Sequence, residues 1–427
     1  MNDIFSRLAA LGVRLPEILL PKSGIDLSKW AVIACDQFTQ DKNYWEKVKS
    51  LSSGSPSCLN LIIPEVYLEE GGESEREKRT DEIRKTMSEY LKGGVFAQPL
   101  HGCVYLERST ERNSKRSGIV FAIDLDKYDW APSSRPLIRA TEGTVTDRLP
   151  PRIKIRRGAP LELPHILLLI DDEKDSLIPS LGEIARRRPP LYETHLMLNS
   201  GAVSGWALDT EEAWALLADG LERLAKTVEE RYSSALPGEM PFLFAVGDGN
   251  HSLAAAKAVW EDHKKQNAGV TGIENHPARW ALVEIENIYD SGIVFEPIHR
   301  VIFGAEPDDI LKLLSSLSHI TCQSEHSGRV IRIESRSPDI ATASIQPLLD
   351  SFAEERKLVM DYIHGEEEVV RLAGDSQRQA VALILPPVRK DGFFKTVAEN
   401  GPLPRKSFSM GEAEEKRFYL ECRKLFS

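Results

Sequence analysis

Residues 242–257 read FLFAVGDGNHSLAAAK, and this stretch decides how the chain is organised. The apolar run Phe242–Val246 follows a proline and is closed by glycines, which is the pattern of a short buried strand. Gly247 and Gly249 flank Asp248 and allow a sharp turn. From Ser252 onward the chain is rich in alanine, a strong helix former. The stretch therefore predicts a strand, a tight polar turn and a helix.

The predicted turn has the features of a phosphate-binding site. The first backbone N–H groups of a helix have no partner within the helix, and the helix start carries roughly half a positive charge, so phosphate binds readily there. Asp248, Asn250, His251 and Ser252 lie in or beside this turn. Two interpretations stay open: a phosphate site, or a helix that Asn250 or Ser252 caps while His251 lies at the surface. The sequence contains no Walker A pattern.

The box DGNHS at residues 248–252, followed by an alanine-rich helix, resembles the DGHHRxxAA box of ParB/sulfiredoxin-like proteins. That group includes sulfiredoxin and the free serine kinases, and in it the box lies at a helix start and holds nucleotide phosphate. The resemblance implies ATP or ADP with Mg²⁺ as cofactor. This chain carries Asn250 where the box usually has histidine, and Ser252 where it usually has arginine. Because arginine is a bidentate phosphate donor, we expect guanidinium groups from elsewhere in the chain to replace it.

The whole chain also resembles an uncharacterised, widespread bacterial and archaeal family that carries the same box late in its sequence. Four further stretches support this resemblance: Cys35–Thr39, Arg139–Glu142 with Asp147 and Arg148, Pro297–Val301, and Leu403–Ser407. Through these stretches the resemblance adds His299, Arg300, Arg405 and Lys406 to the candidate phosphate-binding residues.

The length and composition predict a soluble two-domain protein. We place an N-terminal α/β domain at residues 1–236 and a domain that carries the box at residues 237–427. The net charge of −11 argues against a nucleic-acid partner. The cysteines are odd in number and form no CxxC pair, and we find neither a signal-peptide pattern nor a long apolar segment, so a cytoplasmic location without a membrane is expected. The sequence predicts no separate metal site and does not indicate an oligomeric state.

The stretch at residues 135–158 carries seven basic residues in a net acidic protein, and its prolines and glycines argue against a long helix. Arg139, Thr141, Glu142 and Arg148 bring guanidinium groups, a hydroxyl and a carboxylate together in sequence, which suits phosphate. A solvated basic loop is the alternative. We expect residues 139–148 to fold back onto the box.

Several apolar runs predict further strands, at residues 30–34, 59–64 and 164–170. Asp36 follows the first of them, where it either caps a turn or takes part in chemistry. Predicted helices at residues 74–92 and 210–232 alternate with strands. We therefore expect an α/β or α+β fold with mixed sheets and interleaved helices, and a ParB/sulfiredoxin-like element around the turn.

These observations favour a phosphotransferase that acts on a small hydroxylated metabolite, with a nucleotide or phosphometabolite as ligand. Gly247, Gly249, Asn250, His251 and Ser252 would hold phosphate, and Glu142 or Asp248 would be the base or a magnesium ligand. A nucleotide-binding regulator without turnover is the alternative. A sulfiredoxin-like repair enzyme would need a reactive cysteine, for which Cys35 is the candidate.

Overall fold

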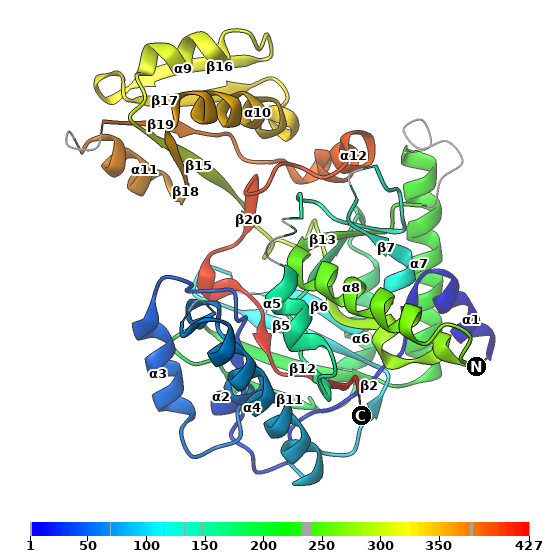
Figure 1. Cartoon of the computed structure of the whole chain (residues 1–427). Coiled ribbons are helices and arrows are strands. Elements are labelled where there is room, and N and C mark those ends of the chain that lie inside the picture. Colours follow the sequence, from blue (N-terminus) through cyan, green and yellow to red (C-terminus); the bar gives the residue numbers. More distant parts are fainter. Residues whose placement is uncertain are drawn as a thin grey trace. The chain divides into compact units, whose positions relative to one another are not determined.

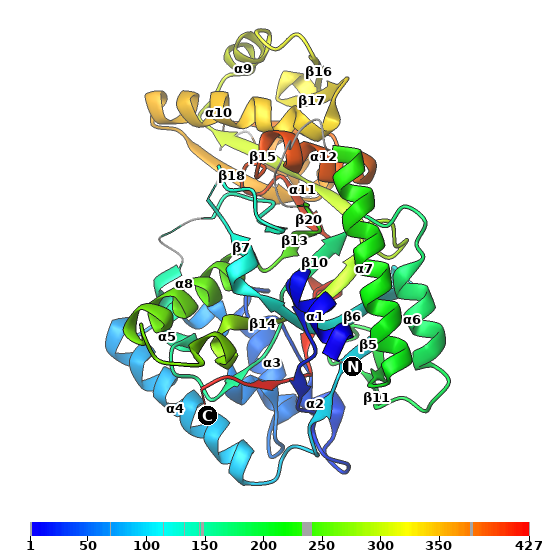
Figure 2. The same cartoon turned by 90° about the vertical axis from the view of Figure 1, so that its right-hand side faces the viewer.

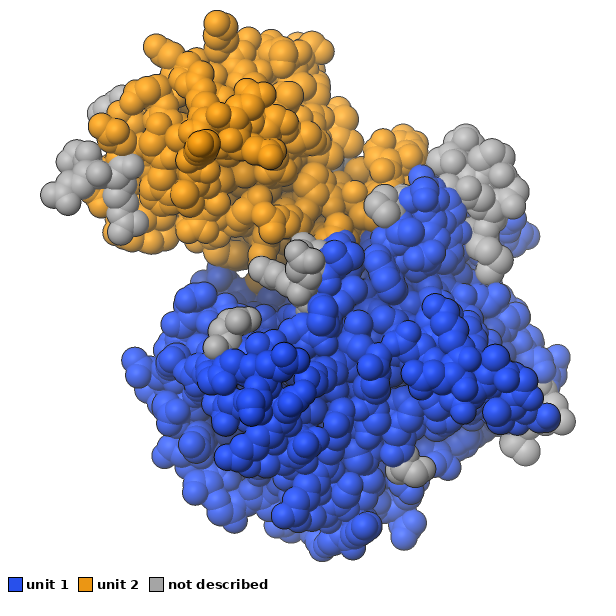
Figure 3. Space-filling model, viewed as in Figure 1, with its two compact units in different colours: residues 1–140, 144–293, 412–427 blue, residues 141–143, 294–411 orange. Residues whose placement is uncertain are grey.

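The computed structural model describes residues 2–68, 70–113, 115–131, 133–144, 146, 149–232, 241–375 and 379–426. The chain divides into two compact units, coloured in Figure 3. Unit 1 comprises residues 1–140, 144–293 and 412–427, and unit 2 comprises residues 141–143 and 294–411. The mixture of helices with parallel and antiparallel strands confirms the predicted fold class.

Unit 1 is built on a ten-stranded mixed sheet in the order β11-β12-β5-β6-β14-β10-β13-β8-β7, with β1 beside β6. The pairs β14/β10, β13/β8 and β8/β7 are parallel, and the other pairs of the sheet are antiparallel. Its strands are β1 (Val13–Arg14), β5 (Cys103–Ser109), β6 (Arg116–Asp124), β7 (Tyr128–Asp129), β8 (Ile138–Arg139), β10 (Leu167–Ile170), β11 (Tyr192–His195), β12 (Ala202–Leu208), β13 (Phe244–Asp248) and β14 (Trp280–Asn287).

Alternating side chains of the sheet divide the core of unit 1 into two apolar clusters. Ile119 and Phe121 of β6 face a cluster that includes side chains of α1, α6, α7 and α8, whereas Val120 faces one that includes side chains of α2, α3 and α4. Figure 2 shows α1, α6 and α7 side by side. The helices are α1 (Asn2–Ala10), α2 (Leu27–Trp30), α3 (Lys42–Ser52), α4 (Gly72–Lys92), α5 (Leu149–Arg156), α6 (Leu177–Ala185), α7 (Glu211–Tyr232) and α8 (Asn250–Gln266).

The C-terminal segment 412–426 belongs to unit 1 and is drawn in red in Figure 1. Its strand β21 (Phe418–Tyr419) pairs with β3 (Val32–Ile33), and β22 (Arg423–Lys424) pairs with β9 (Leu161–Glu162). A further small sheet joins β2 (Glu17–Ile18) and β4 (Leu100–His101). The segment therefore ties the first and middle parts of the chain together.

Unit 2 has a smaller mixed sheet in the order β16-β17-β19-β15-β18, with β20 beside β15. Apolar side chains of α9 and α10 pack on one face of this sheet, and those of α11 pack on the other. Its elements are β15 (Phe295–Phe303), α9 (Pro307–Leu314), β16 (Ile320–Glu325), β17 (Val330–Ser335), α10 (Pro338–Arg356), β18 (Val359–His364), α11 (Glu366–Ala373), β19 (Ala380–Ile384), α12 (Lys390–Asn400) and β20 (Phe408–Met410).

Two sequence-based expectations differ from this fold. The strand predicted at residues 59–64 is wrong, because the 3-10 helix Cys58–Leu61 occupies the first half of that stretch and residues 62–64 form no strand. The division between residues 236 and 237 does not coincide with the two units: it falls within unit 1, among residues 233–240, which lie outside the described residues. Strand β13 pairs with β8 and β10, so the chain on both sides of that point enters one sheet.

Candidate functional site

The turn between β13 and α8 has the predicted form of a strand, a tight turn and a helix. Gly249 adopts φ +82°, and a Cβ atom at this position would lie 3.1 Å from Cα of Ile166, so glycine fits both the backbone and the space. Gly249 is also the N-cap of α8, and no side chain caps the helix there. Asn250 and Ser252 lie inside the helix, so neither is its N-cap. The helix start therefore keeps the character that suits an anion.

Ser252 contacts a histidine that the sequence analysis did not single out. Its Oγ lies 2.9 Å from Nε2 of His165, just before β10. The other ring nitrogen, Nδ1, lies 2.8 Å from the hydroxyl of Tyr419 in β21. Oδ2 of Asp36 lies 3.8 Å from the same Nε2 atom that Ser252 contacts. We call Asp36, His165, Ser252 and Tyr419 the His165 cluster.

Asp36 is half-buried beside several cationic groups. Burial raises the pKa of its carboxyl, but His165, a hydrogen bond from Gln37, Lys416 and Arg152 act against burial, and the net result is a lowered pKa. Arg152 comes from α5, within the predicted basic stretch, and is itself paired with Glu65. Asp36 is therefore a carboxylate at neutral pH and can accept a proton or a cation.

Asp248 connects the turn to the C-terminal segment. Its Oδ1 accepts a hydrogen bond from the Gly249 N–H at 2.8 Å, and its Oδ2 lies 3.2 Å from Nζ of Lys416. His251 is half-buried in the first turn of α8, and Gly247 lies within β13. Among the described residues, Oδ1 of Asn250 is buried without a hydrogen-bond partner.

A hydrogen bond from the C-terminal segment fixes the backbone next to His165. Nε of Arg417 donates to the carbonyl oxygen of Pro164 at 3.0 Å, and the same guanidinium pairs with Glu284 and Glu421. Because Pro164 directly precedes His165, this buried network holds the backbone that carries the imidazole.

Cys35 contacts Tyr419 of the His165 cluster but does not have the character of a reactive thiol. Burial and the charge of Asp36 raise the pKa of Cys35 to about 11, although the Tyr419 hydroxyl and Arg152 act in the opposite direction. The thiolate is the nucleophilic form of cysteine, so this environment disfavours the sulfiredoxin-like alternative.

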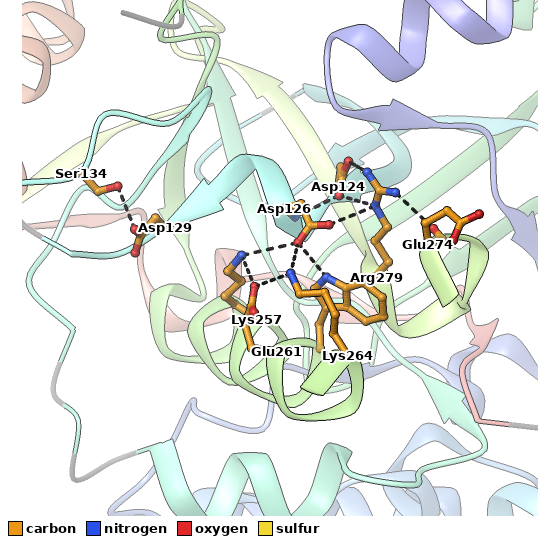
Figure 4. Close-up of polar contacts among 10 residues, drawn as sticks. Asp124, Asp126, Asp129, Ser134, Lys257, Glu261, Lys264, Glu274 and Arg279 are labelled. Carbon is orange, nitrogen blue, oxygen red and sulfur yellow. Dashed lines mark hydrogen bonds and ion pairs between the residues drawn. The ribbon is translucent and has the colours of Figure 1, made fainter. Parts of the chain in front are cut away.

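The other end of α8 is anchored by an ionic network, which Figure 4 shows. Oδ1 of Asp126 accepts hydrogen bonds from Nε1 of Trp260 at 2.8 Å and from Nζ of Lys264 at 2.9 Å. Lys257 lies 3.8 Å from the same oxygen, and Arg279 pairs with Asp124. This network fixes α8 against the segment after β6.

The predicted residues of the basic stretch divide between the two units. Arg139 lies in β8 beside β13, where it is buried, its Nε donates to the carbonyl oxygen of Pro136, and its guanidinium lies 4.7 Å from the ring centre of Phe242. Thr141 and Glu142 belong to unit 2. Arg148 lies outside the described residues. The expected convergence of residues 139–148 on the box stays a prediction.

Unit 2 gathers other predicted residues into a second cluster. Nε of Arg300 donates to Oε1 of Gln346 at 2.8 Å, and its Nη1 donates to the carbonyl oxygen of Ile298. Arg300 and Arg405 lie 4.7 and 5.3 Å from the ring centre of Tyr362. Oε1 of Glu142 accepts from the Ser407 N–H at 3.3 Å. We call Glu142, Arg300, Gln346, Tyr362 and Arg405 the Arg300 cluster.

The remaining predicted residues of unit 2 lie near this cluster in sequence. Nδ1 of His299 accepts from the Leu385 N–H at 3.2 Å, which fixes the ring in the core. Lys406 is exposed and has φ +59°. Phosphate binding by His299, Arg300, Arg405 and Lys406 stays a prediction.

No group of three or more His, Cys, Asp or Glu side chains that could hold a metal ion occurs within the described part of the chain. Among the described helices, none has the length and apolar character needed to cross a membrane.

The comparison with protein families gives one match. The model of a family described as "Protein of unknown function (DUF1015)" matches residues 19–421. No curated protein matches the sequence.

Solved structures give more distant similarities. Free serine kinase in complex with AMP is 12% identical with a TM-score of 0.35, covering 72% of this chain and 92% of the kinase. A conserved hypothetical protein from Pyrococcus furiosus is 11% identical with a TM-score of 0.31, covering 70% of this chain and 90% of that one. SbnI with a C-terminal truncation, from Staphylococcus aureus, is 10% identical with a TM-score of 0.33, covering 68% and 82%.

Proposed function

This chain belongs to the DUF1015 family of proteins of unknown function, and we propose that it is a phosphotransferase. The reaction would move a phosphoryl group between a nucleotide or phosphometabolite and a small hydroxylated metabolite. The observation that carries the proposal is an uncapped helix start with the His165 cluster directly beside it.

The start of α8 would hold the phosphate. Gly249 supplies no capping side chain at this helix start, whose dipole favours an anion, and Lys416 adds a positive charge 3.2 Å from Asp248. Gly247, Asn250 and His251 complete the proposed binding turn. Phosphoryl transfer needs positioning and charge neutralisation of this kind more than covalent chemistry from the protein.

Asp36 would take the proton of the acceptor hydroxyl. Its lowered pKa keeps it ionised, and its side chain is 25% exposed, so a small substrate could reach it. The sequence-based choice of Glu142 as the base competes with this assignment, and the paired variants described in the Discussion decide between them.

The proposed cofactor is ATP or ADP with Mg²⁺. Asp248 would hold the ion in unit 1, since its carboxylate lies at the start of α8, and the ion would neutralise phosphate charge.

Nucleotide turnover by the purified protein tests the proposal. We expect release of ADP from ATP, or of AMP from ADP, that depends on one member of a panel of small hydroxylated metabolites, serine included. Calorimetry would run in parallel. Binding without turnover would favour the nucleotide-binding regulator, and no binding of any nucleotide or phosphorylated metabolite would contradict both functions.

His251→Ala tests the binding turn separately. We expect the nucleotide Kd to rise about tenfold with little change in Tm, because a half-buried turn residue makes few core contacts. His195→Ala, an exposed histidine of unit 1, is the matched control and should change neither quantity. Equal affinity of wild type and His251→Ala would exclude this side chain from the site.

A further inference from the structure

The Ser252–His165 pair has the geometry of a nucleophile beside its base. Oγ of Ser252 and Nε2 of His165 are 2.9 Å apart, and the ring is oriented through Nδ1 by the hydroxyl of Tyr419 at 2.8 Å. A hydroxyl, an imidazole within hydrogen-bond reach and a third group that orients the imidazole form the common arrangement of activated serine nucleophiles.

The bonds around Tyr419 indicate which nitrogen of His165 carries the proton. The phenol oxygen accepts from the Cys35 N–H at 3.3 Å, and its own O–H donates to Sγ of Cys35 at 3.2 Å. With that proton directed to Cys35, we assign the 2.8 Å contact to donation from Nδ1 of the imidazole to the phenol oxygen. Nε2 then carries a lone pair and accepts the proton of the Ser252 hydroxyl.

The positive charge that His165 gains on proton transfer also has a nearby carboxylate. Removing the proton from Ser252 creates an imidazolium, and Oδ2 of Asp36 lies 3.8 Å from the nitrogen that receives the proton. The N–H groups at the start of α8, on which Ser252 itself lies, face the charge of an incoming phosphoryl group.

We propose that Ser252 is a covalent nucleophile, so that phosphoryl transfer in unit 1 proceeds through a phosphoserine at this position. This inference rests on the proposed function. Ser252 Oγ would attack the terminal phosphorus of the nucleotide, forming an O–P bond while the bond to the leaving nucleotide oxygen breaks. The leaving oxygen keeps the electron pair, and the serine proton moves to Nε2 of His165.

The second half of the reaction regenerates the free hydroxyl of Ser252. The acceptor hydroxyl attacks the phosphoserine and gives its proton to Asp36, while His165 returns its proton to the departing Oγ. His165 thus acts first as base and then as acid. The net reaction converts nucleotide and alcohol to a phosphate ester, the shortened nucleotide and one proton.

Isotope exchange without acceptor tests the inference. A phosphoserine intermediate lets the wild-type protein convert labelled ADP to ATP, or labelled AMP to ADP, when only the two nucleotides are present. In Ser252→Ala the rate of this exchange should fall at least about a hundredfold, and Ser252→Thr should keep part of the wild-type rate. Ser28→Ala, in the first turn of α2 and bonded to Asp26 and not to histidine, is the matched control and should exchange normally.

Direct detection of the intermediate makes the result independent of how the variants fold. Wild-type protein quenched with ATP or ADP should carry one phosphoryl group, and peptide mass spectrometry should place it on Ser252. Nucleotide turnover without exchange and without this phosphopeptide would overturn the nucleophile and leave the proposed function intact. No nucleotide binding by calorimetry would overturn both.

Discussion

The His165 cluster of unit 1 and the Arg300 cluster of unit 2 are both polar, but their atoms are engaged in different ways. Nε2 of His165 has two oxygen neighbours, Ser252 and Asp36, and the Asp36 side chain is 25% exposed. Arg300 is 0% exposed, and its Nε and Nη1 donate to fixed acceptors. Burial lowers the pKa of Arg300 to about 10, although Tyr362, Glu142 and Asp350 act in the opposite direction.

The difference separates two uses of a buried polar group. A nitrogen between a hydroxyl and a carboxylate can take a proton from one and be stabilised by the other, which is what acid–base chemistry requires. A guanidinium that donates to Gln346 and to the backbone at Ile298 holds its surroundings in one arrangement. We therefore expect substitutions in unit 1 to change turnover and substitutions of Arg300 to change stability.

The largest expected effect is that of Asp36→Asn. Loss of the proton acceptor should lower turnover about 10³-fold while nucleotide affinity stays within a few-fold. Glu142→Gln is the matched carboxylate-to-amide change in the Arg300 cluster and should keep at least half of the activity. Steady-state kinetics with calorimetry measures both. If Glu142→Gln is the inactive variant, the base lies in unit 2 and the comparison is reversed.

Arg300→Met should destabilise unit 2 by about 3 kcal/mol, because it leaves Oε1 of Gln346 and the carbonyl oxygen of Ile298 buried without donors. Arg405→Met is the matched control: it removes an exposed guanidinium from the same Tyr362 ring and should cost less than about 1 kcal/mol. Hydrogen exchange of β15 amides measures the effect. Tryptophan fluorescence would not report the unfolding of unit 2, since all seven tryptophans lie in unit 1. If Arg300→Met and Arg405→Met lower the stability of unit 2 equally, the hydrogen bonds of Arg300 do not stabilise this unit.

Acid should destabilise unit 2 through His299. Burial lowers the pKa of His299 to about 4 from its usual 6.5, helped by Arg300, His364 and Arg332 and opposed by Glu366. Between these values the unfolded chain binds the proton and the folded chain does not, so the free energy of unfolding falls as pH drops from about 6.5 to 4, by about 3 kcal/mol.

The variant His299→Gln should flatten this pH dependence, because its amide oxygen can still accept from the Leu385 N–H. His326→Gln, an exposed histidine of unit 2, should leave it unchanged. Hydrogen exchange of β15 and β19 at several pH values provides the measurement. If the stability of the His299→Gln variant depends on pH as strongly as that of the wild type, a group other than His299 is responsible for the pH dependence.

The smallest expected effect is that of Lys416→Gln. Without the ammonium 3.2 Å away, the Asp248 carboxylate repels phosphate at the start of α8, and nucleotide affinity should fall about tenfold. Lys424→Gln, exposed in the same C-terminal segment, is the control for a general charge effect. Titration calorimetry compares the two. Equal affinities would leave Lys416 as a structural partner of Asp248 only.

The turn at the start of α8 could be predicted from the sequence. Its signals are a short apolar strand, two glycines and an alanine-rich run, and each depends only on residues next to one another in the chain. The strand expected at residues 59–64 failed for an equally local reason. The side chain of Ser57 accepts a hydrogen bond from the Leu59 N–H, and this caps a 3-10 helix in place of extended backbone.

The partners of Ser252 could not be found in this way. His165 lies 87 positions from Ser252, and Tyr419 lies 254 positions from His165. His165 lies within the apolar run before Asp171, and Tyr419 lies near the end of the sequence outside any recognised motif, so neither residue carries a signal of its own. Arg152 had a usable signal, since it belongs to the basic stretch, but Arg139 in that same stretch packs on Phe242. Only the pairing of distant strands decides which residues meet.

The return of residues 412–426 to unit 1 has a consequence for biosynthesis. Strand β3 pairs with β21, and Cys35 and Tyr419 are 384 positions apart. At bacterial and eukaryotic translation rates, the ribosome adds the missing strand roughly 20–80 s after it has made Cys35. Throughout that interval the nascent chain has an unpaired strand edge and an unfilled apolar face where Phe418 and Leu420 will pack. Unit 1 is therefore completed only after translation has passed through residues 294–411 of unit 2, and the His165 cluster is among the last parts of the protein to assemble.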